Sequence, residues 1–413
     1  MKIHAPKGTR DIMPDDSYKW QYIEDAFSRL ASSYGFDEIR TPMFENTQLF
    51  NRGVGETTDI VQKEMYTFED HAHRSMTLKP EGTSPAVRAF IESGAVRGVQ
   101  PTKYYYSTSC FRYEKPQAGR MREFHQFGVE IFGSESMLAD AEAIALADDF
   151  LTKMGVDDLK LHINSVGCRK CRPVYREALQ NFLMPRFKDL SDESKERFNK
   201  NPMRILDSKD EGDKKIAHGA PHMIDYLCDD CRCAFMNLQE YLNKLDIKYS
   251  IDPKIVRGLD YYTKTAFEFM SDQIGAQGTV CGGGRYDHLI NEIGGSEMPG
   301  VGFGLGKERL LILMEQNGHE FGGKPHPKYF VACADEGARG YALSLVKDMR
   351  SAGMNVISDV SGRKLKAQLR YADKADAEFV VIIGDEEAKT DELTIRNMVS
   401  GEQNKIIRKE FLN

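Results

Sequence analysis

The stretch from residue 110 to 133 constrains the fold more than any other part of the sequence, because it predicts two strands joined by a charged loop. Its second half alternates with a period of two, as a half-buried strand does. One face carries His125, Phe127, Val129 and Ile131, and the other carries Gln126, Gly128 and Glu130. The stretch therefore predicts an antiparallel hairpin with two different faces. An ordinary solvated hairpin with a charged turn is the alternative.

The polar face of this hairpin predicts the floor of a pocket. Gly128 lacks a side chain between two polar residues and leaves room for a small ligand. Arg112 on the first strand supplies a planar set of donors that suits a phosphate. The connecting loop adds Lys115, Arg120 and Arg122. Together these residues indicate a nucleoside triphosphate site.

Length and charge limit the other possibilities. A chain of 413 residues exceeds what one hydrophobic core usually organises, so at least two domains are expected. The sequence has no run of 18 uncharged apolar residues, and its first residues lack the apolar segment of a secretory signal. We therefore expect a cytoplasmic protein that does not enter a membrane. The net charge of −7 argues against general coating of nucleic acid but allows local basic patches.

The chain divides into two predicted domains. Residues 1–325 mix helices and strands, beginning with a helix over residues 18–33, and a glycine-rich segment leads to a helix that ends near Gly318. Within this domain, residues 168–249 are rich in charge and in helix formers and read as a largely helical insertion. The prolines of KPHPK then mark a linker. Residues 326–413 alternate strand, helix, strand, helix, strand, which predicts parallel strands with crossover helices.

Six segments carry a resemblance to a known family. They are PKGTRDIMP, IRTPMFE, FRYEKPQ with REFHQFG, GFGLGKERL, RGLDYYT and GGGRYD. In these segments the chain resembles the histidyl-tRNA synthetases, a class II aminoacyl-tRNA synthetase family, over essentially its full length. The resemblance implies an α+β catalytic domain with an antiparallel sheet flanked by helices, followed by an α/β anticodon-binding domain. It also implies L-histidine, ATP with Mg²⁺ and tRNA(His) as partners, and a homodimer that meets around Pro42.

The chemistry of the first step indicates which residue types matter. The carboxylate of an amino acid is already ionised at pH 7, so its attack on the α-phosphate of ATP needs no general base. Positioning and neutralisation of phosphate charge remain. The resemblance implies that Arg112, Arg257 and Arg309 are catalytic, and that Arg112, Glu114, Arg120 and Arg309 bind ATP. A surface ion pair is the alternative for any single arginine.

For histidine, the resemblance implies a second set of residues. Glu81, Thr83 and Gln126 face the amino group, Glu130 and Tyr262 face the imidazole with Tyr261 nearby, and Arg112 and Arg257 complete the site. On a structural interpretation, Glu81 is a loop carboxylate and both tyrosines belong to the core. Because adjacent strand residues face opposite ways, we expect only one of the two tyrosines to reach the ligand directly.

Three glycine and basic segments complete the predicted sites. Gly302, Gly304 and Gly306 do not form a phosphate loop, because Glu308 follows Lys307; with residues 282–284 they predict close packing beneath a ligand. By resemblance, Lys115, Gln117 and Arg122 contact tRNA, although Lys115 stands where the family commonly has arginine. A C-terminal basic stripe is either an anticodon contact or a solvated helix face. It comprises Arg363, Lys364, Lys366, Arg370 and Lys374.

The cysteines allow two interpretations. Cys168, Cys171, Cys228 and Cys231 form two C-x-x-C pairs at the ends of the insertion, and they are either ligands of a structural Zn²⁺ or reduced thiols. Cys110, Cys281 and Cys333 are predicted to be small buried residues.

Two other functions remain open from sequence. One is a catalytically inactive, synthetase-like subunit that regulates a phosphoribosyltransferase of histidine biosynthesis, and the other is an ATP-dependent ligase with a different acceptor. Such regulatory paralogues usually lose motif residues and the anticodon-binding domain. This chain keeps Arg112, Arg257 and Arg309 together with a candidate anticodon-binding domain, which favours an active synthetase.

Overall fold

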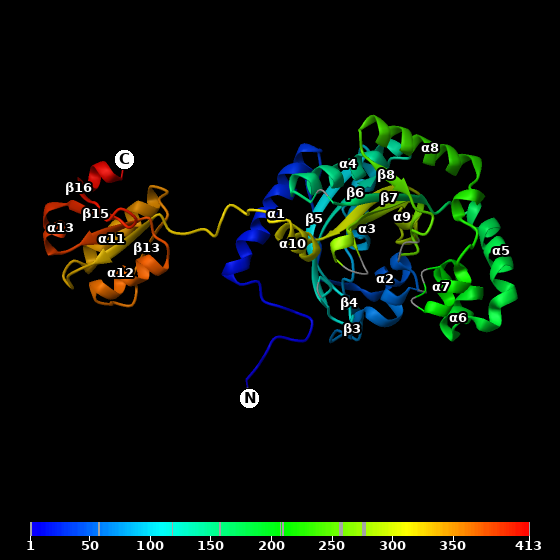
Figure 1. The fold of residues 1–413 in the computed structure, drawn as a ribbon, viewed down its shortest axis with the longest axis horizontal. Helices are drawn as coiled ribbons and strands as arrows, with labels where there is room; N and C mark the ends of the chain where they lie inside the picture. The colour runs from blue at the N-terminus through cyan, green and yellow to red at the C-terminus, as the bar shows by residue number, and fades with distance from the viewer. Residues whose placement is uncertain are drawn as a thin grey trace. The chain divides into compact units, whose positions relative to one another are not determined.

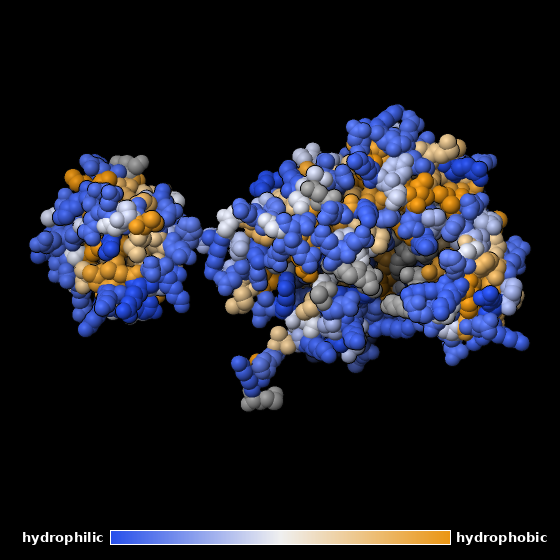
Figure 2. All heavy atoms as spheres, viewed as in Figure 1, coloured by the Kyte–Doolittle hydropathy of each residue, from blue (hydrophilic) through white to orange (hydrophobic). Residues whose placement is uncertain are grey.

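The computed structural model describes residues 2–56, 58–117, 119–156, 158–206, 208, 210–255, 259–274 and 278–412. It forms two compact units, residues 1–321 and residues 322–413. Among the helices that it describes, none has the length and apolar character needed to cross a membrane. The outward surfaces of both units are predominantly hydrophilic on the face drawn in Figure 2.

An eight-stranded sheet forms the centre of the first unit (Figure 1). Its order is β1 (Asp37–Glu38), β5 (Thr102–Phe111), β6 (Glu123–Phe132), β11 (Gly300–Gly306), β10 (Thr279–Tyr286), β9 (Thr263–Met270), β7 (Lys160–Ser165) and β8 (Tyr249–Ile251). The six central strands are antiparallel, which confirms the predicted sheet and the β5–β6 hairpin. The sheet is nevertheless mixed, because the short edge strands β1 and β8 each pair in parallel with their neighbours.

Helices cover one face of this sheet and bury its apolar side chains. They are α1 (Pro14–Ser33), α4 (Met137–Lys153), α8 (Asp229–Lys244) and α10 (Lys307–Gln316). Phe127, Val129 and Ile131 of β6 lie in the resulting core. Helix α1 begins at Pro14, so its predicted start at residue 18 is wrong. The first turn, with a proline and two aspartates, suits a helix N-terminus but shows no apolar period.

The other face of the sheet is covered only in part. Helices α3 (Thr83–Glu92) and α9 (Leu289–Glu292) contribute to a second core there. Nearby lie α2 (Thr47–Val54) and a small sheet of β2 (Phe44–Asn46), β4 (Ser75–Leu78) and β3 (Tyr66–Glu69). The uncovered part of this face forms the floor of the cavity described below.

The insertion is largely helical, as predicted. It contains α5 (Cys171–Leu183), α6 (Asp192–Lys200), α7 (Glu211–Ala217) and short 3-10 turns before it reaches α8. Its side chains form a separate small core that includes Tyr175, Leu179 and Phe198. The later part of α8 instead joins the main core through Phe235, Leu238 and Leu242. The insertion is therefore anchored by its last helix.

The second unit contains the predicted alternation and an addition to it. Strands β12 (Tyr329–Cys333), β13 (Val356–Ser358) and β14 (Phe379–Ile383) are parallel and are connected by α11 (Arg339–Ser351) and α12 (Leu365–Lys374). Beyond β14 the chain adds α13 (Asp385–Thr390), the antiparallel strands β15 (Glu392–Asn397) and β16 (Gln403–Ile407), and α14 (Arg408–Phe411). Sequence analysis missed these last elements, because their polar residues hide the strand period.

Candidate active site

A cavity of about 590 Å³ lies over the polar face of the central sheet. Its wall includes nine of the predicted site residues, which are Glu81, Thr83, Arg112, Glu114, Arg120, Gln126, Tyr261, Tyr262 and Arg309. Arg257 lies outside the described residues. Glu130 is fully buried next to the wall, against Tyr106, which does line the cavity.

The period-two prediction for β6 is confirmed, but the predicted use of Gly128 is wrong. Gln126 lines the cavity while Phe127 and Val129 enter the core. The space above Gly128 is filled by protein, since a Cβ atom there would lie 2.2 Å from the Tyr106 ring. A Cβ on Gly82 would meet the same ring at 2.3 Å. Both glycines therefore make room for a tyrosine, not directly for a ligand.

Two tyrosines hold the Glu130 carboxylate. The Tyr106 hydroxyl donates to Glu130 Oε1 at 2.9 Å, and the Tyr286 hydroxyl donates to Oε2. Burial raises the pKa of Glu130 to about 8, although hydrogen bonds from Tyr286, Thr83 and Tyr106 oppose the shift. Sequence analysis missed Tyr106 and Tyr286. Their only signal was position, in a strand paired with β6 and in the GGGRYD segment.

Arginines gather at another part of the cavity wall. Arg112 donates from Nε to the Pro80 carbonyl at 2.8 Å, and Arg309 donates to the carbonyls of Gly119 and Thr279. Neither forms an ion pair with a carboxylate among the described residues, whereas Arg120 pairs with Glu114. Burial and the nearby charges of Arg120 and Arg112 lower the pKa of Arg309. This crowding of positive charge favours an anionic ligand.

The Glu81 side chain is hydrogen-bonded to the first residues of α3, which begins at Thr83. The Glu81 carboxylate accepts from the backbone N–H groups of Thr83 and Ser84 at 2.6 and 2.8 Å. These are among the first N–H groups of the helix, which have no partner within it. Glu81 is therefore held in one orientation and is only 4% exposed.

Tyr261 and Tyr262 both line the cavity. Their expected placement in a strand is wrong, because they precede β9, so strand alternation does not turn one of them away from the cavity. Their ring centroids lie 4.6 Å apart. The backbone carbonyl of Tyr262 also accepts from Arg172 of α5, so the insertion contacts this wall directly.

The glycines of β10 and β11 divide into two groups. Gly282, Gly304 and Gly306 line the cavity, as their predicted place beneath a ligand requires. Gly302 is instead needed by Glu130, whose Oε2 would lie 2.0 Å from a Cβ at that position. A Cβ atom at Gly283 would likewise lie 2.2 Å from the Gly302 carbonyl oxygen, and one at Gly284 would lie 2.3 Å from that of Thr265.

Lys307 and Glu308, at the start of α10, brace the sheet beside Arg309. Glu308 accepts from the backbone N–H of His125 at 3.0 Å and lies 2.8 Å from its ring Nδ1. Lys307 donates to Glu24 at 2.6 Å and to Ser107. Sequence analysis used these two residues only to exclude a phosphate loop, so it missed the contacts that hold the start of α10 against β6, β5 and α1.

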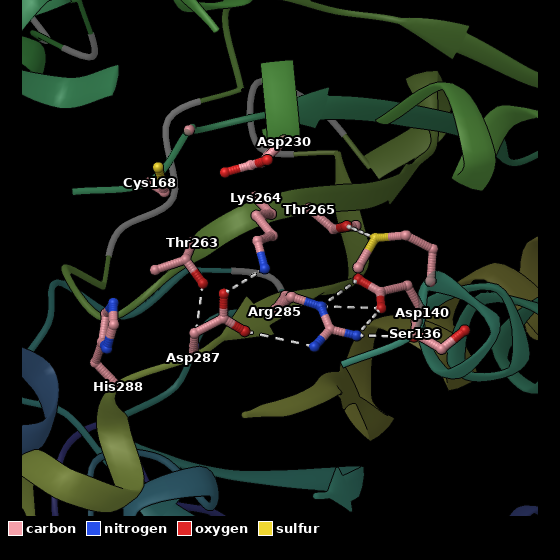
Figure 3. A network of polar contacts seen from close by, with 12 residues as sticks. Ser136, Asp140, Cys168, Asp230, Thr263, Lys264, Thr265, Arg285, Asp287 and His288 are labelled. Atoms are coloured by element: carbon pink, nitrogen blue, oxygen red, sulfur yellow. Dashed lines mark hydrogen bonds and ion pairs between the residues drawn. The ribbon is translucent and has the colours of Figure 1, made fainter. Parts of the chain in front are cut away.

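A buried ion pair joins the strand behind the cavity to α4 (Figure 3). Arg285 of β10 bonds Asp140 of α4, and both side chains are 0% exposed. Arg285 also donates to the carbonyls of Ser134 and Ser136, at 2.8 and 3.1 Å. The next residue, Tyr286, is one of the two tyrosines that donate to Glu130. The pair therefore fixes the strand that presents this tyrosine.

The three residues predicted to contact tRNA are not part of the cavity wall. Lys115 and Gln117 are exposed on the loop between β5 and β6. Arg122 is partly buried, with its guanidinium 3.9 Å from the centroid of the Tyr113 ring. In the second unit, the side chains of the basic stripe, Arg363, Lys364, Lys366, Arg370 and Lys374, are all exposed.

The structure brings the four insertion cysteines together. The Sγ atoms of Cys168, Cys171, Cys228 and Cys231 all lie within 4.8 Å of one another. Cys110 and Cys281 are buried as predicted. Cys333 is only partly buried, so that prediction is wrong; it lies at the end of β12, where its thiol donates to the Asp335 carbonyl at 3.0 Å.

Comparison with known protein families decides the class of this site. A family model described as histidyl-tRNA synthetase matches residues 8–310, and one described as anticodon binding domain matches residues 328–413. The chain belongs to the histidyl-tRNA synthetase family. This family accounts for the predicted class II fold and for the second unit with its own sheet.

Individual relatives agree with this assignment. A histidine–tRNA ligase from Caldanaerobacter subterraneus is 54% identical over 411 residues, which is 100% of this chain and 99% of that protein. One from Clostridium botulinum is 49% identical over the same share of this chain and 98% of its own length. The crystal structure of apo histidyl-tRNA synthetase from S. aureus has a TM-score of 0.85 at 38% identity and covers 100% of this chain and 99% of that one.

Proposed function

We propose that the protein attaches L-histidine to tRNA(His) in two steps. In the first step, a carboxylate oxygen of histidine attacks the α-phosphorus of ATP, histidyl adenylate forms and pyrophosphate leaves. In the second, the terminal 3′-hydroxyl of the tRNA attacks the activated carbonyl, and AMP leaves. The high identity to histidine–tRNA ligases over the whole chain carries this proposal.

In the adenylation step, arginines position ATP and neutralise its charge. Arg112 bridges the histidine carboxylate and the α-phosphate, and Arg309 meets the γ-phosphate end, with Arg120 and Glu114 beside them. Arg257 approaches the α-phosphate by resemblance alone. Support for the first two comes from their place in the cavity wall and from side chains that make no ion pair with a described carboxylate. ATP enters with Mg²⁺.

The deeper end of the cavity recognises histidine. Glu81, Thr83 and Gln126 face its amino group, and Glu130, with Tyr261 and Tyr262, faces the imidazole. Tyr106 and Tyr286 hold the Glu130 carboxylate in place. An amino acid with an apolar side chain could make none of the hydrogen bonds that the imidazole makes to Glu130 and the tyrosines, so it should be rejected by roughly 10⁴ without editing.

The partners and location follow from the same reaction. The loop with Lys115, Gln117 and Arg122 contacts the acceptor end of the tRNA, the second unit reads the anticodon, and the protein acts in the cytoplasm. Two chains associate near Pro42, where Phe44 is 53% exposed and Phe68 is 44% exposed on neighbouring parts of the small sheet. A Zn²⁺ ion in the cysteine cluster would serve the insertion, since none of the four cysteines lines the cavity.

The test is ATP–pyrophosphate exchange with each of the twenty amino acids, followed by charging of tRNA(His). Exchange with histidine alone, and then charging, is the expected result. Exchange without charging would indicate a ligase with another acceptor. No exchange by folded protein with Mg²⁺ would indicate the regulatory subunit.

A further inference from the structure

Four cysteine thiols meet where helices α5 and α8 of the insertion begin. Cys168 and Cys171 lie at the start of α5, and Cys228 and Cys231 lie at the start of α8. We propose that these four thiolates bind one structural Zn²⁺ ion. This site is separate from the adenylation reaction and does not depend on it.

The distances between the sulfur atoms fit a tetrahedral ion. Cys168 Sγ lies 3.6 Å from Cys171 Sγ and 3.8 Å from Cys228 Sγ. A Zn–S distance of about 2.3 Å requires neighbouring sulfurs about 3.8 Å apart. A disulfide needs about 2.05 Å, so no bond joins these pairs. The sulfur atoms are thus placed around a common centre and not in bonded pairs.

The backbone supports thiolates at this position. The Lys170 N–H donates to Cys168 Sγ at 3.4 Å, and the Cys228 N–H donates to Cys171 Sγ at 3.1 Å. Hydrogen bonds of this kind orient the ligands of a metal and stabilise their negative charge. Two of the sulfurs, those of Cys171 and Cys231, belong to buried residues, which would keep water from that side of the ion.

The insertion has a structural need for such an ion. Its own core is small, and Cys171 and Cys231 are part of it. A core of this size rarely stabilises a region alone, and metals commonly supply the difference. The ion would join residues 57 apart in sequence. It would also hold α5, whose Arg172 contacts the Tyr262 carbonyl at the cavity wall.

The first experiment measures metal in the full-length protein purified from zinc-supplemented cells. We expect about one zinc per chain in the wild type, and less than about a tenth in Cys168→Ser and Cys228→Ser. The matched control is Cys233→Ser, because Cys233 is exposed two residues beyond Cys231 and is absent from the cluster; it should keep its zinc. A wild type without zinc, bound iron in place of zinc, or full zinc in Cys168→Ser would overturn the proposal.

A second measurement needs no variant and so remains valid if the serine variants do not fold. Chelation of wild-type protein should expose four additional thiols to a thiol reagent and lower the melting temperature. Addition of Co²⁺ to the chelated protein should give the visible absorption of a tetrahedral thiolate site, and Zn²⁺ should remove it. Reduced structural thiols predict no change in thiol reactivity or melting on chelation, and that result would overturn the site.

Discussion

At the scale of single residues, the cavity combines a fixed carboxylate with arginines that lack carboxylate partners among the described residues. Glu130 is held by two tyrosine hydroxyls, while Arg112 and Arg309 bond only to backbone carbonyls in the described contacts. These two arrangements differ in what they can bind. The first suits a donor such as an imidazole N–H, and the second suits phosphate.

Glu130→Gln should separate histidine binding from ATP binding. The amide keeps the shape of the side chain but cannot accept on both sides, so we expect the KM for histidine to rise by roughly 10- to 100-fold. The KM for ATP should change little. Pyrophosphate exchange at varied concentrations of each substrate measures both values, and an unchanged KM for histidine would contradict the role of Glu130.

The same variant should change the pH dependence of stability. Between the ordinary pKa of 4.5 and the folded value of about 8, the folded protein keeps the Glu130 proton and the unfolded chain releases it. Wild-type stability should therefore fall as pH rises through this window, by up to about 5 kcal/mol, relative to Glu130→Gln. Melting temperatures of both proteins at pH 5.5 and pH 8.5 test this. A constant difference would mean that Glu130 titrates normally.

Arg112→Lys tests the proposed contact of Arg112 with the α-phosphate of ATP. Lysine keeps the charge but loses the planar fork, so exchange should slow by roughly 100-fold while the fold is retained. Arg74→Lys is the matched control, because Arg74 is 69% exposed and pairs with Asp70 on the surface. If both variants slow exchange equally, the loss does not come from the cavity.

At the scale of elements, the sequence predicts strands and helices that have a regular apolar pattern. It misses features that depend on contacts between elements far apart in the sequence. The β5–β6 hairpin and the parallel strands of the second unit follow from local patterns. The Tyr106 ring above Gly128 does not, because it depends on register between two strands. The short edge strands and the turn at Tyr261 are set by neighbours and carry no period of their own.

Breaking the ion pair between Arg285 of β10 and Asp140 of α4 should strongly destabilise the fold, because both side chains are fully buried. Arg285→Met would leave the Asp140 carboxylate buried without its partner, which costs about 3–5 kcal/mol. The double variant Arg285→Met with Asp140→Leu should recover the part of this loss that comes from the unpaired carboxylate, while the Ser134 and Ser136 carbonyls still lack their donor. Thermal unfolding of the three proteins measures the difference. If the single and the double variant were equally stable, the unpaired Asp140 carboxylate would not be the cause of the loss.

At the scale of the whole molecule, the two units divide the proposed tasks. The first unit holds the cavity, and the second presents a basic stripe, on α12 and just before it, whose side chains are all exposed. The first unit also presents the apolar residues Phe44 and Phe68 on its small sheet. The described contacts within one chain do not bury these two rings, which agrees with a proposed contact between two chains.

Phe44→Glu should weaken the proposed dimer. A charge placed in an apolar interface must be desolvated, so light scattering should show a shift from the mass of two chains toward that of one. Val399→Glu is the control, since Val399 is 95% exposed in the second unit. A wild type that is already a single chain would overturn the dimer.

The burial of Glu130 also has a consequence for proton exchange between the enzyme and its buffer. If bound histidine pairs as an imidazolium with ionised Glu130, binding near pH 7 moves a proton from the carboxyl to the ring, because Glu130 has a pKa of about 8 and free histidine one of about 6.5. No proton is then exchanged with the buffer. Above pH 8 the ring must take a proton from the buffer, and below about pH 6 the carboxyl must release one. The heat of binding should therefore depend on the ionisation enthalpy of the buffer at both extremes, with opposite sign, and not between them.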